Sequence, residues 1–197
     1  MSKNPHFNHE QPFWDKDQLV IGIDEVGRGV LAGPVTVAGV IFPPHFDPQK
    51  LSQVNDSKKL TPNTRLKLAP LIKKHALHYT IKSSSHKIID ESGIIFALHQ
   101  AMHKILNQLP QADHLLLDGL SLPNSSNYPQ KTHQTAIKKG DQISFSIAAA
   151  SILAKVHRDS LMQKHHQKHP HYHWHSNKGY GTKQHTTSLK KHGPSTL

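Results

Sequence analysis

Two runs of β-branched and other apolar residues, separated by a short glycine-rich segment, constrain the fold of this chain more than any other feature. The runs are LVIGIDEVG at 19–27 and PVTVAGVIF at 34–42, and RGVLAG lies between them. β-branched residues favour extended backbone, and glycines favour a change of chain direction. We therefore expect two neighbouring strands at the start of the domain.

The next part of the chain predicts a helix followed by a third strand. Thr61 before Pro62 is typical of an N-cap followed by a proline at the first helical position, so we expect a helix from there to about Lys74. The segment HYTIKSS at 78–84 is a shorter candidate strand.

Residues 91–110 predict a longer helix that is closed by Pro110. Apolar residues recur there at three- and four-residue spacing, which places them on one helical face. This face consists of Ile94, Leu98, Ala101, Met102, Ile105 and Leu109.

The remaining elements predict an α/β domain with a mixed five-stranded sheet flanked by helices. The wholly apolar run within 113–119 is typical of a strand buried on both faces, and 133–141 predicts a fifth strand that ends near Asp141. The stretch 144–169 contains neither Gly nor Pro and predicts a long helix that turns from apolar to basic. We expect an early antiparallel meander, then strands reached by helical crossovers, and a basic, irregular tail after Pro170.

The length of 197 residues suits one domain with a core of its own. We expect residues 19–197 to form it and residues 1–18 to be a polar, flexible lead. The absence of cysteine suits a reducing compartment. No signal-like stretch and no apolar window of roughly 18 residues occurs, so we expect a cytoplasmic protein without a membrane span.

The charge balance indicates a polyanionic partner. The chain carries 24 Lys and Arg against 13 Asp and Glu, a formal net charge of +11, and 19 histidines add titratable charge. Aromatic residues make up only 6%, so contact with a duplex backbone is favoured over stacking on single strands.

Four acidic residues lie at or just after the ends of expected strands: Asp24, Glu25, Asp118 and Asp141. Clustered carboxylates repel one another, and a divalent cation removes that conflict. Their oxygen ligands favour Mg²⁺ or Mn²⁺, and two such ions about 4 Å apart would support phosphodiester hydrolysis. Taken singly, Asp118 before a glycine and Asp141 after one also suit ordinary turns.

Asp24 and Glu25 set a geometric condition for such a site. Adjacent residues of a regular strand face opposite sides of the sheet. If both carboxylates serve one site, the strand must bend or bulge at 24–25, which Gly22 and Gly27 would permit.

Motifs in a fixed order along the chain carry a resemblance to a known family. The chain resembles ribonuclease HII, the type 2 ribonuclease H of bacteria, from about residue 19 to 194. The matching motifs are GIDEVGRG with LAGPV at 22–35, NDSKKLT at 55–61, LLLDG at 115–119, KGD at 139–141, AAASILAKVHRD at 148–159 and KGYGT at 178–182.

The resemblance implies a ribonuclease H-like fold and a metal-dependent endonuclease. Such enzymes cut the RNA strand of RNA/DNA hybrids and cut 5′ to single ribonucleotides embedded in duplex DNA, leaving 3′-hydroxyl and 5′-phosphate ends. By motif position, Asp24, Glu25, Asp118 and Asp141 would be the four acids that hold two Mg²⁺ or Mn²⁺ ions.

The resemblance also assigns the contacts with substrate. The triplet Gly27, Arg28 and Gly29 would lie against the ribose at the RNA–DNA junction, and Tyr180 would stack on the following deoxyribose. Glycines admit close approach of a sugar, and backbone groups can detect a 2′-hydroxyl. The residues expected to hold backbone phosphates are Lys58, Lys59 and Lys178.

Three positions depart from the pattern of the family. Val30 stands where relatives usually have Pro, and Asn177 stands where they frequently have His. The chain ends at HGPSTL, whereas relatives usually continue with a basic and aromatic segment.

Two other functions remain open at this point. A ribonuclease HIII has the same fold but carries an extra N-terminal substrate-binding domain. A non-catalytic, basic nucleic-acid-binding protein would bind without making product. For the ribonuclease HII reading we expect a monomer.

The histidine cluster at 165–175 has its own alternatives. His171, His173 and His175 would share one face of an extended segment, which suits incidental Ni²⁺ or Zn²⁺ binding. Affinity for phosphates that weakens as the pH rises through about 6 to 7 is the favoured role.

Overall fold

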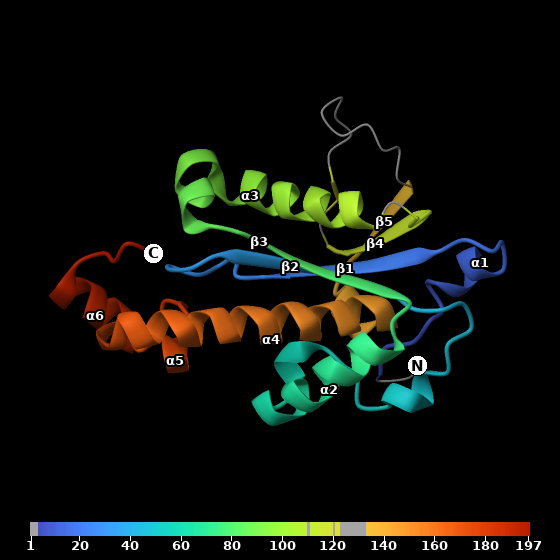
Figure 1. The fold of residues 1–197 in the computed structure, drawn as a ribbon, viewed down its shortest axis with the longest axis horizontal. Coiled ribbons are helices and arrows are strands. Elements are labelled where there is room, and N and C mark those ends of the chain that lie inside the picture. The colour runs from blue at the N-terminus through green and yellow to red at the C-terminus, as the bar shows by residue number, and fades with distance from the viewer. Residues whose placement is uncertain (1–3, 110, 120, 123–132) are drawn as a thin grey trace.

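The fold is a five-stranded mixed sheet with helices on both faces (Figure 1). The computed structural model describes residues 4–109, 111–119, 121–122 and 133–197. The strand order is β3-β2-β1-β4-β5; β2 pairs antiparallel with both β1 and β3, whereas β4 pairs parallel with β1 and β5. The expected antiparallel meander is confirmed, and β4 lies parallel to β1 and β5, as crossover connections require; most of the connection from β4 to β5 lies outside the described residues. The strands are β1 Val20–Val26, β2 Val35–Ile41, β3 His78–Ser84, β4 His114–Asp118 and β5 His133–Ile137.

Long helices cover both faces of the sheet, and a further helix packs against one of them. Helix α3 (His86–Gln108) lies on one face, and α4 (Phe145–Lys168) lies on the other with α2 (Pro62–His75) beside it (Figure 1). Alternate residues of β1 divide between two core clusters: Ile21 and Ile23 pack with α3, and Val20 packs with α4. The side of the sheet to which a β1 residue points therefore follows from its position in the strand.

The predicted helix signals are largely confirmed. Thr61 caps α2, because its hydroxyl accepts a hydrogen bond from the Thr64 N–H at 3.2 Å. Helix α3 begins earlier than expected, at His86, and Gly93 interrupts it with φ +83°. Its expected closure by Pro110 lies outside the described residues. The buried members of the expected face are Leu98, Ala101, Met102, Ile105 and Leu109.

The described part of the N-terminal lead packs onto the domain. It contains the short helix α1 (Gln11–Trp14), and the Phe7 and Trp14 rings join the core cluster on the α4 side. Short 3₁₀ helices connect the larger elements among the described residues. They are η1 Pro48–Leu51, η2 Ser57–Lys59, η3 Gly140–Gln142 and η4 Pro170–Tyr172.

The expectation of an irregular tail is wrong for much of the chain after Pro170. Helices α5 (Trp174–Asn177) and α6 (Lys183–His192) form there. The Tyr172 and Trp174 rings stack with centroids 5.0 Å apart and are buried in a small cluster, and this packing supplies the stability that the polar sequence does not suggest. Among the described residues, none of the helices combines the length and apolar character needed to span a bilayer.

Candidate active site

Three of the four predicted carboxylates meet at one edge of the sheet. Asp24 and Asp118 lie at the ends of the parallel neighbours β1 and β4, and Asp141 lies in η3, which follows β5. One oxygen of each carboxylate lies within 4.8 Å of the other two, and the three residues could hold a metal ion. The sequence-based grouping of these acids therefore corresponds to a real cluster.

Two close approaches of the backbone shape this cluster. A Cβ at Gly22 would lie 2.3 Å from the backbone carbon of Ser146, so the start of α4 rests directly on β1, two residues before Asp24. The Gly140 N–H donates a hydrogen bond to Asp118 Oδ1 at 2.7 Å. This bond fixes the turn that carries Asp141 to the end of β4.

Glu25 stands beside the cluster and is not a member of it. Its backbone N–H donates to Asp24 Oδ1 at 2.7 Å, and its side chain is 14% exposed. Arg28 Nη1 lies 3.9 Å from Glu25 Oε1. The structure thus gives the two adjacent acids different surroundings.

The expected bend of the strand at 24–25 is wrong. The pairing of β1 with β2 runs without a break from Ile21–Ile41 to Val26–Thr36, so no residue is inserted as a bulge. Strand alternation consequently turns Asp24 toward the α4 side and Glu25 toward the α3 side. Gly22 serves helix packing, since a Cβ there would strike Ser146.

Burial and mutual repulsion make the cluster unfavourable when it is fully ionised. Burial, followed by the charges of Glu25 and Asp118, raises the pKa of Asp24 well above its usual range. Burial and the charge of Asp118 also raise the pKa of Glu25. For Asp141, burial together with Asp118 and Asp56 raises the pKa to about 6. A bound cation would offset all three effects.

Lys58 and Asp56 border the cluster. Lys58 Nζ lies 3.5 Å from Asp141 Oδ2; burial lowers the pKa of Lys58, but the nearby carboxylates outweigh it and raise that pKa overall. Asp56 is buried, caps η2 through the Lys58 N–H and accepts a hydrogen bond from Gln142 Nε2 at 3.2 Å. Sequence reasoning missed Asp56, although its place before Ser-Lys-Lys is typical of a cap.

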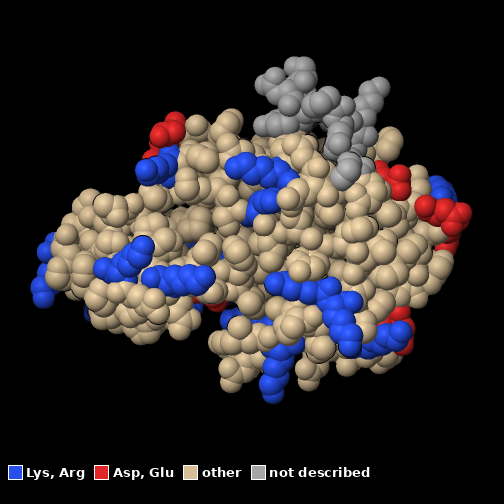
Figure 2. All heavy atoms as spheres, viewed as in Figure 1, with Lys and Arg blue, Asp and Glu red and all other residues tan. Residues whose placement is uncertain are grey.

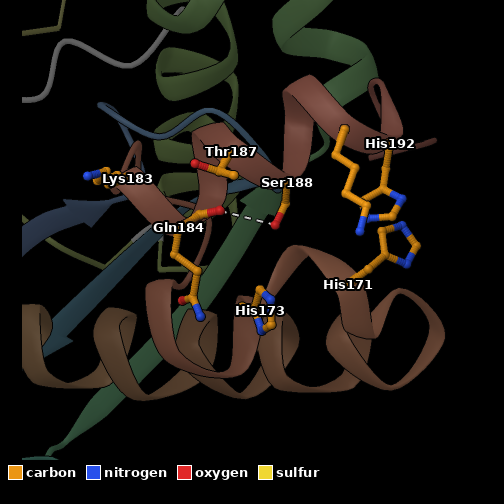
Figure 3. A pocket seen from close by; sticks show the side chains of 8 residues that line it. His171, His173, Lys183, Gln184, Thr187, Ser188 and His192 are labelled. Carbon is orange, nitrogen blue, oxygen red and sulfur yellow. Dashed lines mark hydrogen bonds between the residues drawn. The ribbon is translucent and has the colours of Figure 1, made fainter.

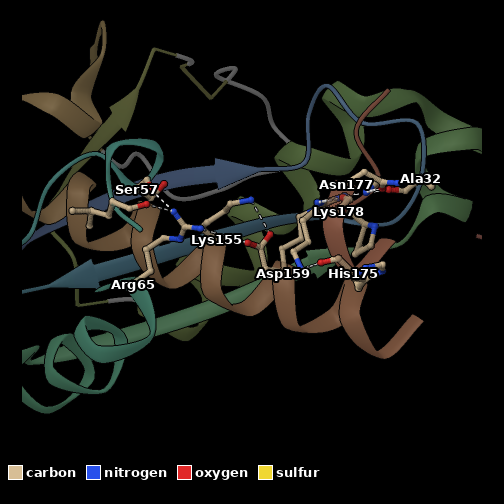
Figure 4. A network of polar contacts seen from close by, with 12 residues as sticks. Ala32, Ser57, Arg65, Lys155, Asp159, His175, Asn177 and Lys178 are labelled. Atoms are coloured by element: carbon tan, nitrogen blue, oxygen red, sulfur yellow. Dashed lines mark hydrogen bonds and ion pairs between the residues drawn. The ribbon is translucent and has the colours of Figure 1, made fainter. Parts of the chain in front are cut away.

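A buried arginine ties together two loops that the sequence assigns to substrate. Arg158, on α4, is 0% exposed and donates hydrogen bonds to three backbone carbonyls. Nε donates to Pro34 O at 2.8 Å, Nη2 to Ala32 O at 3.1 Å and Nη1 to Lys178 O at 2.8 Å. The loop after the Gly-Arg-Gly triplet and the KGYGT segment are therefore held by one guanidinium. Figure 4 shows Ala32 and Lys178, which supply two of the three carbonyls.

The two loops also contact each other directly. The Leu31 N–H donates to Gly179 O at 2.9 Å, and a Cβ at Gly179 would lie 2.3 Å from Ala32 O. The Tyr180 ring lies 5.9 Å from the Arg158 guanidinium carbon and is 37% exposed. The residues predicted to contact the ribose and the deoxyribose thus belong to two loops that touch each other.

The glycines of the triplet have different surroundings. Gly27 has φ +100°, and a Cβ there would lie 2.5 Å from Arg158 Nε and 2.7 Å from Pro34 O. A Cβ at Gly29 would meet no atom within 4 Å. Gly27 is therefore required by internal packing, whereas Gly29 leaves an open approach to the backbone.

Lys59 and Lys178, the remaining residues predicted to bind phosphate, differ in whether their side chains contact the rest of the protein. Lys59 is exposed. Lys178 has φ +52° and donates from Nζ to His175 O at 2.6 Å, and burial lowers its pKa. The buried Asn177 Oδ1 accepts from the Gly179 N–H at 2.9 Å, so this departure from the family pattern supports the turn of the KGYGT segment.

The histidine cluster does not adopt the extended form expected of it. Residues 170–172 are 3₁₀ helical and His173 has φ +55°, so the three alternating histidines do not lie on one extended segment. His171 instead pairs with His192, their ring centroids 4.6 Å apart. Within the described part of the chain, only the three aspartates form a group of three or more metal-ligating side chains.

An open groove of about 660 Å³ lies in this C-terminal region (Figure 3). Burial and three neighbouring histidines, His192 first among them, lower the pKa of His171. The lining residues of the groove are His171, His173, Lys183, Gln184, Thr187, Ser188, Lys191 and His192.

Positive charge is spread widely over the surface. Figure 2 shows Lys and Arg side chains from the end that carries α6 across to α2, whereas acidic side chains occupy a few separate places. Such a surface suits a phosphate backbone.

Comparison with known proteins gives a consistent result. The family model of ribonuclease HII matches residues 21–196. The ribonuclease HII of Synechococcus sp. (strain JA-3-3Ab) is 46% identical over 192 residues, covering 97% of this chain and 85% of that protein. The ribonuclease HII of Chlorobium chlorochromatii (strain CaD3) is 44% identical over 191 residues, covering 95% and 91%. The structure of the PCNA:RNase HII complex from Archaeoglobus fulgidus matches with a TM-score of 0.72 at 27% identity, covering 88% of this chain and 87% of that chain.

Proposed function

Because the chain belongs to the ribonuclease HII family, and is therefore a divalent-metal-dependent endoribonuclease of the ribonuclease H type that acts on RNA/DNA hybrids, we propose a more specific activity for it. The chain cuts duplex DNA on the 5′ side of a single embedded ribonucleotide as well as the RNA strand of hybrids. The products carry 3′-hydroxyl and 5′-phosphate ends. The observation that carries this proposal is the convergence of Asp24, Asp118 and Asp141.

The donor set fits a hard divalent cation. Asp24, Asp118 and Asp141 offer carboxylate oxygens, and the raised pKa values of Asp24 and Asp141 reflect a charge density that a cation would stabilise. We propose that these residues, with Glu25 at the border, hold two Mg²⁺ or Mn²⁺ ions. When bound, the ions supply activation of water and stabilisation of the leaving oxygen.

The protein's own residues position the substrate around this cluster. Lys58, 3.5 Å from Asp141 and largely exposed, is placed to hold a phosphate beside the acids. Lys59 and Lys178 would hold phosphates farther along the backbone. Arg28, whose side chain is 48% exposed, can turn from Glu25 to a phosphate oxygen.

The joined loops explain how a ribose would be selected. The open backbone at Gly29 admits close approach of the sugar, so peptide N–H and C=O groups can detect its 2′-hydroxyl. The exposed Tyr180 ring would stack on the following deoxyribose, where a further hydroxyl would clash. Since Arg158 fixes both loops, the two contacts have a set spacing.

The test is cleavage of a DNA duplex that contains one ribonucleotide, with Mg²⁺ present, by the wild type and by Asp24→Asn. We expect the variant to be slower by about 10²-fold or more, because it removes a buried ligand charge. Chelation should stop the wild type, and metal should restore it. A non-catalytic binding protein would instead bind with chelator present and give no product; unaltered cutting by Asp24→Asn would refute the assignment.

We further propose that the chain acts as a monomer.

A further inference from the structure

A buried carboxylate from the N-terminal segment contacts the start of the helix that follows the acidic cluster. Glu10 is 0% exposed, and its Oε1 accepts hydrogen bonds from Ser144 Oγ at 2.7 Å and from the Ser146 N–H at 3.2 Å. The Ser146 hydroxyl donates to the same oxygen. A carboxylate is favourable there because the first N–H groups of a helix carry partial positive charge.

The same N-terminal segment also contacts residues 143–145, through its backbone and an aromatic ring. The His6 N–H donates to Ile143 O at 2.9 Å, and the Phe145 N–H donates to His6 O at 3.1 Å. The Phe7 and Phe145 rings pack with centroids 4.7 Å apart. Residues 143–146 are thus fixed by backbone, carboxylate and ring contacts that all come from residues 6–10.

Residues 143–146 directly follow the turn that carries Asp141. The N–H groups of Ile143 and Ser144 donate to Gly140 O at 3.0 and 2.8 Å, which closes the turn. The Gly140 N–H donates to Asp118 Oδ1. Asp118 therefore fixes the entrance of the turn and Glu10 fixes its exit.

We propose that Glu10 is a positioning residue of the metal site, which holds Asp141 at its distance from Asp24 and Asp118 by anchoring Ser144 and Ser146. This inference rests on the proposed function, in which Asp141 is a metal ligand. It gives the N-terminal segment a part in the reaction although none of its residues belongs to the carboxylate cluster. Residues that orient metal ligands commonly change metal affinity by about 10- to 100-fold when altered.

The experiment measures Mn²⁺ affinity of the full chain by calorimetry at pH 7.5, without substrate. We expect Glu10→Ala to raise the Kd about tenfold. Glu10→Gln should raise it by less, because its amide oxygen still accepts from the Ser146 N–H. The matched control is Trp14→Phe, which disturbs a buried ring of the same segment, in contact with Phe7, and should lower the Tm while it leaves the Kd unchanged.

Asp24→Asn serves as the reference that separates this inference from the proposed function. If Asp24→Asn binds Mn²⁺ like the wild type, the proposed metal site itself is wrong. If Asp24→Asn loses binding and a folded Glu10→Ala keeps the wild-type Kd, only the role of Glu10 is overturned. Should Glu10→Ala fail to fold, Ser146→Ala takes its place, since it removes one hydroxyl donor to Glu10; a weaker Kd supports the inference and an unchanged Kd overturns it.

Discussion

Asp24 and Asp118 occupy matching positions on neighbouring parallel strands, each one residue beyond the last pair of their ladder, Ile23 and Leu117. Residues at matching positions of parallel strands point to the same face of the sheet. The register of β1 against β4 therefore forces two carboxylates together. Their repulsion follows from the strand register, and a bound cation would offset it.

The pH dependence of stability without metal should reveal this repulsion at Asp141. Its pKa of about 6 in the fold lies above the ordinary aspartate value of about 3.9. Its contribution to stability is therefore present below the ordinary pKa and is lost as the pH rises through about 6. We expect the Tm of Asp141→Asn minus that of the wild type, measured in EDTA, to increase from pH 4 to pH 7. The exposed Glu91→Gln should give a nearly constant difference, and a flat profile for Asp141→Asn would contradict the argument.

Asp24 and Glu25 should contribute unequally to metal affinity. Asp24 belongs to the carboxylate cluster, whereas Glu25 points toward the other side of an unbroken strand. We expect Asp24→Asn to raise the Mn²⁺ Kd by more than about tenfold and Glu25→Gln to raise it by less, with cleavage slowed in both. Calorimetry and single-turnover cleavage measure the two effects. Equal losses of affinity in the two variants would show that Glu25 binds the metal as directly as Asp24 does.

Substitution of the two glycines of the triplet should affect different properties, namely stability for Gly27 and substrate recognition for Gly29. Gly27→Ala places a Cβ against Arg158 and Pro34 at positive φ, so we expect a loss of roughly 2 kcal/mol and a Tm lower by about 4–8 °C. Gly29→Ala should leave the Tm nearly unchanged, because its Cβ meets no protein atom. It should raise KM for the single-ribonucleotide duplex about tenfold through contact with the sugar. A normal KM in Gly29→Ala would argue against sugar contact at this residue.

Arg158→Lys should strongly lower the free energy of unfolding although the positive charge is retained. One ammonium cannot reproduce the three directed hydrogen bonds to Pro34, Ala32 and Lys178. We expect a loss of roughly 3 kcal/mol, measured by urea unfolding, because buried carbonyls lose their donors. Lys155→Met, which removes an ion pair from the same helix, should cost less. Equal losses would mean that the fork of Arg158 has no special role.

The groove beside α6 should contribute to duplex binding through its lysines. The slope of log K against log salt is negative, and each phosphate contact that is lost reduces its magnitude by about 0.9. We therefore expect Lys183→Ala with Lys191→Ala to reduce the slope for an RNA/DNA hybrid by about 1 to 2, measured by fluorescence anisotropy in EDTA. The exposed Lys16→Ala is the control. A slope equal to that of the wild type would exclude the groove from the duplex path.

Local patterns were enough to predict the sheet and three of its acids. Runs rich in β-branched residues indicated β1 and β2, a shorter run of the same kind indicated β3, and the apolar run before Asp118 indicated β4. Acids that follow strand ends meet whenever the strands are neighbours, so Asp24, Asp118 and Asp141 could be grouped from sequence.

What could not be predicted depends on partners that are remote in sequence. The burial of Glu10 arises from contacts with residues more than 130 positions away, and that of Arg158 from carbonyls on two loops. No local pattern distinguishes these charges from exposed ones. The predicted bend at 24–25 was wrong because it assumed that both acids must enter one cluster, whereas the pairing with β2 keeps the strand regular.

The shared anchorage of the two loops around Arg158 has a consequence for protein engineering. Since Arg158 and the bond from Leu31 to Gly179 hold segments 27–34 and 177–181 as one unit, neither can be exchanged alone between relatives. In a chimaera that receives only one loop, the backbone carbonyls of that loop would not lie where the buried Arg158 guanidinium can donate to them. Altered sugar selectivity should therefore be sought by transferring both segments together with the residue at 158.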